Sequence, residues 1–307
     1  MMPQMLKSSY ALMKQTVSEW IDLGVSRMGA ALAFYTLFAV APLFVIVLAV
    51  AGIWFGEEAA RRELFGQVSG LVGSEGGEAI QALVSAARKP TTGAWATVIA
   101  VVTLFVGATG VFVQLQDTLN SIWGVRRKPG RGLRNFLKDR LLSFALIVGI
   151  GFLLLVSLIL SAGLSALGNF MTGLLPAQEI LWQWINFGVS FGVITLLFAM
   201  IFKVLPDVTI AWKDVWIGAL LTALLFNFGK YLLGLYLGRS SVTSAYGAAG
   251  SLIIVLLWVY YSAQILFFGA KFTQIYSNRY GSRLEPAPGA EAVTLTEVVT
   301  NQPALPS

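Results

Sequence analysis

The chain lacks cysteine and histidine altogether, and only 12% of its 307 residues are charged. Without cysteine there are no disulfides, no thiol nucleophiles and no thiolate metal ligands. Without histidine, the side chain that most often acts as a general base near neutral pH is missing as well. A metal site built from carboxylates alone stays open, but the 15 acidic residues are few and lie mostly in predicted loops. We therefore expect no catalytic residue, no metal site and no cofactor, and a protein that is not an enzyme.

Apolar residues dominate what remains: they make up 57% of the chain, and mean hydropathy is +0.76. A typical soluble domain carries about 25% charged residues, roughly twice the share found here. The composition therefore predicts an all-α polytopic membrane protein. Six apolar runs reach the roughly 20 residues that a transmembrane helix needs, and these predicted spans are Gly29–Ile53, Ala94–Leu115, Leu141–Leu164, Leu181–Leu205, Val215–Leu237 and Ala248–Phe272.

The distribution of Lys and Arg predicts that both termini are cytoplasmic. Of the 21 cations, fifteen fall in the N-terminal segment, the connections after the second and fourth spans, and the C-terminal segment. Five fall in the remaining connections, and Lys230 lies inside a span. Cytoplasmic loops collect Lys and Arg, and six spans return the chain to its starting side. The net charge of +6 therefore fits membrane topology and does not require a nucleic-acid partner.

Three segments follow along the chain. Residues 1–28 are predicted to form a cytoplasmic interfacial helix, although a leader that docks on the bundle fits the pattern equally well. Residues 29–280 form the six-helix transmembrane domain, whose outer loop 54–93 holds two short amphipathic helices that either cap the bundle or act as a spacer. Residues 281–307 are predicted to be a disordered tail. The apolar face of the first segment consists of Leu6, Tyr10, Met13, Val17, Trp20 and Ile21.

Lys230 is the anomaly of the fifth apolar run. A cation at mid-membrane costs about 2.5–3.5 kcal/mol on insertion scales. Lys230 lies about seven residues from the outer end, roughly 10 Å along a helix, so snorkelling to the interface is one explanation. Ala223, Asn227 and Gly234 share its helical face, which favours an orientation into the bundle. We therefore predict that Lys230 and Asn227 contact a substrate.

The second predicted span carries a stripe of small and polar residues. Spacings of four, three, four and three place them on one helical face, with Asn120 following near the cytoplasmic end. Small residues let helices approach closely, so such a face is expected to point inward. Ordinary helix packing, with a solvated acid at the boundary, explains the same pattern. The stripe consists of Thr103, Gly107, Gly110, Gln114 and Asp117.

Other local features concern the first and last spans and the basic loop 126–140. Pro42 interrupts the backbone hydrogen bonding of the first span and predicts a kink there. Trp258, Tyr261 and Gln264 share a face of the last span, where aromatic residues pack more often than they bind. The basic loop is predicted to meet anionic lipid headgroups. Nucleic-acid binding is disfavoured because Phe136 is the single aromatic residue available for base stacking.

Four blocks of sequence resemble the YihY/BrkB family of bacterial six-helix membrane proteins, in the right order over about residues 20–280. They read AALAFYTLFAVAPLF, QDTLNSIWGV, LPDVTIAWKDVWIGALLTALLFNFGKYLLGLYL and SAYGAAGSLIIVLLWVYYSAQILFFGAKF. The family was long labelled ribonuclease BN, which this histidine-free sequence does not support. The resemblance implies a multi-pass protein of the bacterial plasma (inner) membrane. It also implies a role suggested for the family, the movement of lipids or lipid-like envelope precursors.

Carried over by position, the family pattern falls on residues in the first, fifth and last spans and in the segments that follow the second span and precede the last. The family usually has a glutamate where this chain has Lys271, which weakens the expectation of a proton-coupled mechanism. The matching positions are Tyr35, Pro42, Asn120, Lys230, Tyr236, Tyr246, Gly247, Trp258, Gly269 and Ala270.

Taken together, these features favour a transporter of a lipid or lipid-like anionic amphiphile, with Asp117 and Asn120 near an inner gate and membrane lipids as partners. Alternatives are an ion-coupled exporter of small solutes, with Asp117 as its acid, or a non-transporting envelope-assembly scaffold; a homo-oligomer is compatible with each. The candidate substrate or transport residues are Lys230, Asn227, Asp117, Asn120, Gln114, Tyr35, Tyr236, Tyr246, Trp258 and Gln264. The candidate hinge and packing residues are Pro42, Gly107, Gly110, Gly234 and Gly247.

Overall fold

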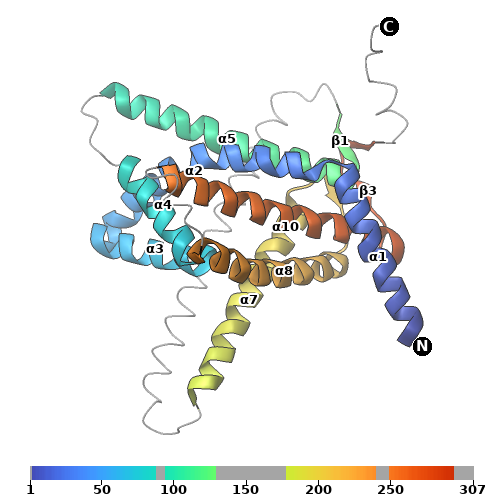
Figure 1. The fold of residues 1–307 in the computed structure, drawn as a ribbon. Coiled ribbons are helices and arrows are strands. Elements are labelled where there is room, and N and C mark those ends of the chain that lie inside the picture. The colour runs from blue at the N-terminus through green and yellow to red at the C-terminus, as the bar shows by residue number, and fades with distance from the viewer. Residues whose placement is uncertain (1, 88–93, 129–177, 240–248, 294–307) are drawn as a thin grey trace. The chain divides into compact units, whose positions relative to one another are not determined.

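The structure is a computed structural model that describes residues 2–87, 94–128, 178–239 and 249–293. These residues are mainly helical, as predicted, and Figure 1 shows the order of the elements along the chain. The helices are α1 (Met2–Asp22), α2 (Val25–Phe55), α3 (Glu57–Val72), α4 (Ser74–Ala87), α5 (Ala94–Trp123), α7 (Gln178–Val204), α8 (Trp212–Arg239) and α10 (Gly250–Tyr280). Four short strands, which an all-α prediction omits, are β1 (Val125–Arg127), β2 (Val208–Thr209), β3 (Glu285–Pro286) and β4 (Ala290–Ala292).

Within the described residues, three helical segments are long and apolar enough to cross a membrane. They are Phe187–Val204, Trp212–Leu237 and Gly250–Tyr280. A fourth candidate joins Tyr10–Asp22 to Val25–Val40 across a short break. The predicted third span, Leu141–Leu164, lies outside the described residues, so the six-span topology and its orientation stay predictions.

The chain divides into two compact units. The first unit comprises residues 1–23, 116–223 and 267–307, and the second comprises residues 24–115 and 224–266. The boundaries fall within α5, α8 and α10, each of which therefore contributes residues to both units. Each unit has its own interactions.

In the second unit, the two helices of the loop 54–93 pack against α2 and against each other (Figure 1). Helix α3 begins after Gly56, with Glu57 and Glu58 in its first turn, where acidic side chains complement the helix dipole. It ends at Val72 and is followed by Gly73, whose φ of 86° suits glycine best. The loop therefore forms two helices separated by a single glycine.

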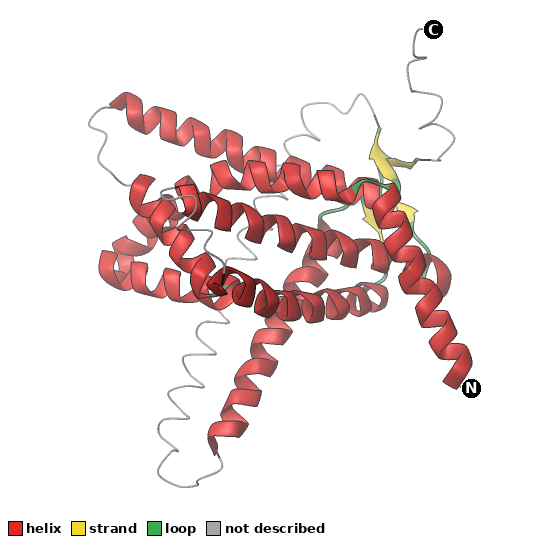
Figure 2. Cartoon of the chain, in the orientation of Figure 1, coloured by secondary structure: helices red, strands yellow, loops and turns green. Residues whose placement is uncertain are grey.

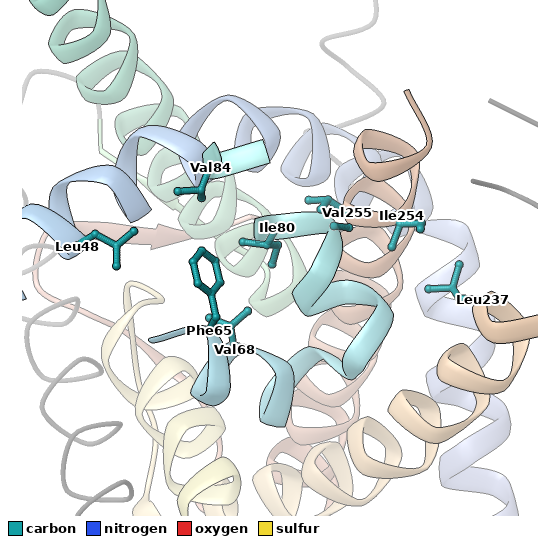
Figure 3. Packing of buried hydrophobic residues seen from close by; sticks show 9 residues of the cluster. Leu48, Phe65, Val68, Ile80, Val84, Leu237, Ile254 and Val255 are labelled. Carbon is teal, nitrogen blue, oxygen red and sulfur yellow. The ribbon is translucent and has the colours of Figure 1, made fainter. Parts of the chain in front are cut away.

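An apolar cluster packs these loop helices against the longer helices α2, α8 and α10. Its members come from α2, α3, α4, α8 and α10, and Figure 3 labels most of them. Fully burying such a side chain stabilises a fold by about 1.5–3 kcal/mol. The loop helices are thus part of the core of this unit and do more than separate two spans. The cluster contains Leu48, Phe65, Val68, Ala79, Ile80, Val84, Leu237, Ile254 and Val255.

The first unit contains all four strands, drawn in yellow in Figure 2. Strand β1 pairs antiparallel with β4, and β2 pairs antiparallel with β3. Residues 281–307 are predicted to be a disordered tail, and the structure differs over 285–292, which form β3 and β4. The reason is long-range pairing: these strands fill their backbone hydrogen bonds with partners far away in sequence, so no local periodicity marks them. Residues 294–307 lie outside the described residues.

Candidate functional site

Lys230 has a protein partner at the end of a loop helix. Its Nζ donates a hydrogen bond to the backbone oxygen of Gly70, at 3.0 Å. Gly70 lies in the last turn of α3, where carbonyl groups lack donors within the helix. The negative end of the helix dipole also favours a nearby cation. The cost of placing a lysine in an apolar helix is thereby reduced by an oxygen from the loop 54–93.

The side of α8 that carries Lys230 differs from its exposed apolar side. Leu224, Phe228, Tyr231 and Leu235 are exposed and follow helical spacing along one face. Lys230 is half-buried, on a face turned about 100° from that of Tyr231. This placement supports an orientation away from the face that lipid would cover.

Three neighbours of Lys230 on α8 differ in their surroundings. Asn227 is half-buried, as is Gly234, and a Cβ added at Gly234 would meet no atom within 4 Å. Tyr236, one of the candidate site residues, is exposed. Tyr246 and Gly247 lie outside the described residues. Lys230 and Asn227 therefore share a helix face that has room beside Gly234, whereas Tyr236 projects elsewhere.

Aromatic residues of α10 pack against α8 in the second unit. The rings of Trp258 and Phe226 meet edge to face with centroids 6.0 Å apart. The Tyr261 hydroxyl lies so close to Gly229 that a Cβ there would come within 1.8 Å of it. Trp258 and Tyr261 therefore hold two helices together, and glycine at position 229 makes their close approach sterically feasible.

Gln264, on the same helix, contacts a different partner. Its Nε2 donates to the backbone oxygen of Ser26 in α2 at 3.5 Å, a long hydrogen bond. A Cβ on Gly29 would come within 2.1 Å of the same nitrogen. Gln264 thus lies against the first turns of α2, and the structure does not bring it together with Trp258.

The stripe on α5 meets α2 at its two glycines. A Cβ added to Gly107 would lie 3.2 Å from the backbone nitrogen of Ala39. A Cβ at Gly110 would lie 2.6 Å from the ring of Tyr35, which is itself partly exposed. These positions have space for glycine only. Helix α2 continues through Pro42 without a break in its assigned helix.

Asn120 belongs to a cluster in the first unit that joins the end of α5 to the connection between α7 and α8. Its Nδ2 donates to Asp207 Oδ2 at 2.8 Å, and the Asp207 backbone N–H donates to Asn120 Oδ1 at 2.8 Å. Arg127 Nε donates to the same Asp207 oxygen, at 2.8 Å, and forms an ion pair. Asn120 is only 4% exposed. We call Asn120, Arg127 and Asp207 the Asp207 cluster.

The polar neighbours of Asn120 on α5 are placed differently. Gln116 is buried and donates from Nε2 to the backbone oxygen of Leu205 at 3.0 Å. Asp117 is exposed, and Gln114 is half-buried. Asp117 therefore differs from the buried Asn120 in exposure, although the charges of Arg127 and Asp207 in the Asp207 cluster both act on it.

Lys271, where the resemblance led us to expect a glutamate, is buried and forms an ion pair with the partly exposed Glu19. It is 5% exposed, and its Nζ lies 2.6 Å from Glu19 Oε2 of α1. Leu12 of α1 packs in one cluster with Phe272 and Ile275 of α10. The N-terminal helix therefore docks on the first unit, as one of the two alternatives from the sequence proposed.

The basic loop 126–140 is described only as far as Lys128. Arg126 pairs with Glu291 of β4 at 2.7 Å, and Arg127 pairs with Asp207. Two cations expected to meet lipid headgroups thus have acidic protein partners. Residues 129–140 lie outside the described residues, so their contact with lipid stays a prediction.

Sequence reasoning did not single out Glu19, Gln116 or Asp207. A signal for Asp207 exists, since it is one of two acids in the short connection between the predicted fourth and fifth spans. Glu19 carries a weaker signal, as an acid on an otherwise amphipathic helix. In the described ranges, no three acidic side chains lie close enough together to hold a metal ion.

The family model described as Virulence factor BrkB matches residues 16–294. The chain belongs to the BrkB family. The resemblance seen in the four sequence blocks is thereby confirmed.

Several bacterial relatives share this similarity, and those described next are each named UPF0761 membrane protein. The protein from Teredinibacter turnerae is 27% identical over 282 residues, covering 88% of this chain and 61% of the relative. The protein from Pseudomonas paraeruginosa is 30% identical over 247 residues, covering 78% of this chain and 56% of the relative. The chain thus spans about three fifths of the length of these relatives or less. No solved structure matches.

Proposed function

We propose that this BrkB family member is a membrane transporter that moves a lipid or lipid-like anionic amphiphile across or between the leaflets of the bacterial plasma (inner) membrane. The observation that carries the proposal is the contact of Lys230. Among the residues that the structure describes, a cation in an apolar helix is held by a neutral carbonyl oxygen, that of Gly70, rather than by an acidic side chain.

Because its partner is neutral, the Lys230 ammonium can exchange the Gly70 oxygen for another hydrogen-bond acceptor. The ammonium has three donors, and Gly70 uses one of them. A phosphate or carboxylate oxygen of a headgroup is the stronger acceptor, because it adds an attraction between opposite charges that the neutral carbonyl lacks. A bound headgroup would therefore compete with Gly70 for Lys230.

The exposed apolar face of α8 completes a site for an amphiphile. Leu224, Phe228, Tyr231 and Leu235 lie beside the polar face that holds Lys230. In this arrangement a headgroup contacts Lys230 while its acyl chains remain in the lipid phase along α8. Exchange between Gly70 and the headgroup would also free the end of α3, which links headgroup binding to movement of the loop 54–93.

Reconstituted vesicles test the proposal directly. Purified protein in phosphatidylcholine vesicles would be given a trace of fluorescent phosphatidylglycerol, and transfer between leaflets followed by chemical quenching of the outer leaflet. We expect wild type to accelerate transfer over protein-free vesicles. Lys230→Met should slow it at least about tenfold, because a hydrogen bond to a charged group is worth about 1.5–3 kcal/mol.

Lys213→Met is the matched control, since Lys213 lies on the same helix and is exposed. Its transfer rate should equal that of wild type. Equal rates for wild type and Lys230→Met would remove Lys230 from the site but leave the transporter proposal standing. Wild-type rates no faster than those of protein-free vesicles, for anionic and zwitterionic probes alike, would refute the transporter proposal.

A further inference from the structure

Helix α1 has three distinct faces, of which the first binds the protein. Leu12 packs with Phe272 and Ile275, Thr16 is fully buried, and Glu19 pairs with Lys271 at 2.6 Å. Leu12, Thr16 and Glu19 are four and three residues apart, so they lie along one side of the helix. This docking face fixes the rotation of α1 about its own axis.

The second face is apolar and uncovered. It contains Tyr10, Met13, Val17 and Ile21, all exposed, with Tyr10 at 72% and Ile21 at 61%. Spacings of three, four and four place them in a row that is distinct from the docking face. Exposing four large apolar side chains in a row to water is unfavourable, since each side chain buried elsewhere would gain about 1.5–3 kcal/mol.

The third face is polar and exposed. Lys14, Gln15, Ser18 and Asp22 occupy it, and Gln15 Nε2 donates to Glu19 Oε1 at 2.8 Å. It lies between the apolar face and the docking face on one side of the helix. A helix with one face toward protein, one apolar and one polar is suited to a place where protein, lipid and water meet.

We propose that α1 lies in the headgroup layer of the membrane, with Tyr10, Met13, Val17 and Ile21 inserted toward the acyl chains and the polar face in water. The partner is the bilayer surface itself. Chain continuity supports this occupant: only Leu23 and Gly24 separate α1 from α2, and Tyr10–Asp22 and Val25–Val40 qualify together as a membrane-embedded pair. Tyr10 and the half-buried Trp20 are also residues that favour the membrane interface.

This proposal does not depend on transport, because it concerns where α1 lies and not what crosses the membrane. It also unites the two alternatives from the sequence, since the helix docks through one face and meets lipid through another. Because apolar contact drives the insertion, we expect it in zwitterionic as well as anionic vesicles. On the polar face Lys14 is accompanied by Asp22, and Lys7 lies two turns before Lys14 in the same helix.

The absence of cysteine makes a site-directed spin-label test straightforward, because each introduced cysteine is unique. The full chain, in phosphatidylcholine vesicles, would carry a label at one of five positions. Collision rates with oxygen, which concentrates in lipid, and with a water-soluble nickel complex would be measured. The variants are Val17→Cys and Ile21→Cys on the apolar face, Gln15→Cys and Ser18→Cys on the polar face, and Phe34→Cys, an exposed α2 position in a candidate span.

We expect labels at positions 17 and 21 to collide with oxygen several times more often than with nickel, as at position 34. Labels at 15 and 18 should show the reverse. Equal access of nickel to 17 and 18 would overturn the proposal, because it would place the apolar face in water. Dipolar broadening at 17 and 21 that disappears on dilution with unlabelled protein would also overturn it, by assigning the face to a second copy of the chain.

Discussion

Two regions of this protein handle a charge in opposite ways. In the first unit, Asp207 accepts from Arg127 and Asn120, so an anion is matched by a cation and an amide. In the second unit, Lys230 donates to the neutral carbonyl of Gly70. Asp207 is therefore matched by an opposite charge, whereas the hydrogen bond of Lys230 in the described part of the chain is with a neutral group.

The different partners of Asp207 and Lys230 indicate different roles for these two charged residues, which sequence alone does not distinguish. Removing one member of a matched set leaves the others buried and unpaired, which is strongly destabilising. Removing a cation with a neutral partner leaves one carbonyl without a donor but also removes the cost of holding a charge in an apolar environment. Stability and transport should therefore respond differently to substitutions in the two regions.

Asp207→Asn should give the largest loss of stability. Arg127 would lose its ion pair with Asp207 and Asn120 would face a second amide, so we expect the free energy of unfolding to fall by about 3 kcal/mol. Thermal unfolding of the purified protein in detergent, followed by circular dichroism, measures the change. Asp22→Asn serves as the control, because Asp22 is exposed on α1. A variant as stable as the control would show that the Asp207 cluster contributes little.

A smaller loss is expected at the ion pair between α1 and α10. Glu19→Lys or Lys271→Glu alone places like charges 2.6 Å apart in the wild-type geometry and should cost about 2 kcal/mol. The double variant restores opposite charges and should recover most of the loss, with a coupling of about 1–3 kcal/mol. Unfolding of all four proteins under one condition completes the cycle. Additive losses, without recovery, would contradict a specific pair.

Lys230→Met should change the free energy of unfolding by less than about 1 kcal/mol in either direction. The lost hydrogen bond, worth about 1.5–3 kcal/mol, is offset by removal of a charge that costs a similar amount in an apolar helix. The same unfolding measurement, set beside the vesicle assay, sharpens the comparison with Asp207. A loss as large as that of Asp207→Asn would show that Lys230 serves mainly to hold α3.

Sequence patterns predict the long helices well and the contacts between distant segments poorly. Unbroken apolar runs marked α8 and α10: α8 exceeds its predicted span by a few residues at each end, whereas α10 begins at Gly250 and continues past Phe272 to Tyr280. The partner of Lys230 could not be found in this way, because it is a backbone oxygen 160 residues away with no side-chain signature. The same holds for β3 and β4, each too short for a two-residue alternation to be recognised.

Position along a helix also did not predict which candidate site residues are buried and which are exposed. Asn120 and Asp117 are three residues apart on α5, yet one is buried in the Asp207 cluster and the other is exposed. Asn120 is buried in a cluster with Asp207, which lies in the connection between α7 and α8. The spacing of residues along α5 contains no information about that connection. Lys271 was recognised as a departure from the family pattern, but its partner Glu19 lies in a segment whose docking the sequence left open.

The smallest effect is expected where strand β1 meets β4. Arg126 and Glu291 form an ion pair at 2.7 Å, but both side chains are substantially exposed, at 49% and 33%. Exposed pairs contribute about 0.2–1 kcal/mol and are screened by salt. Glu291→Gln should therefore lower the unfolding free energy by at most about 0.5 kcal/mol at low salt, and by nothing measurable in 1 M NaCl. A loss that persists in high salt would show that Glu291 holds β4 in place by more than charge, and would make this contact resemble the Asp207 cluster.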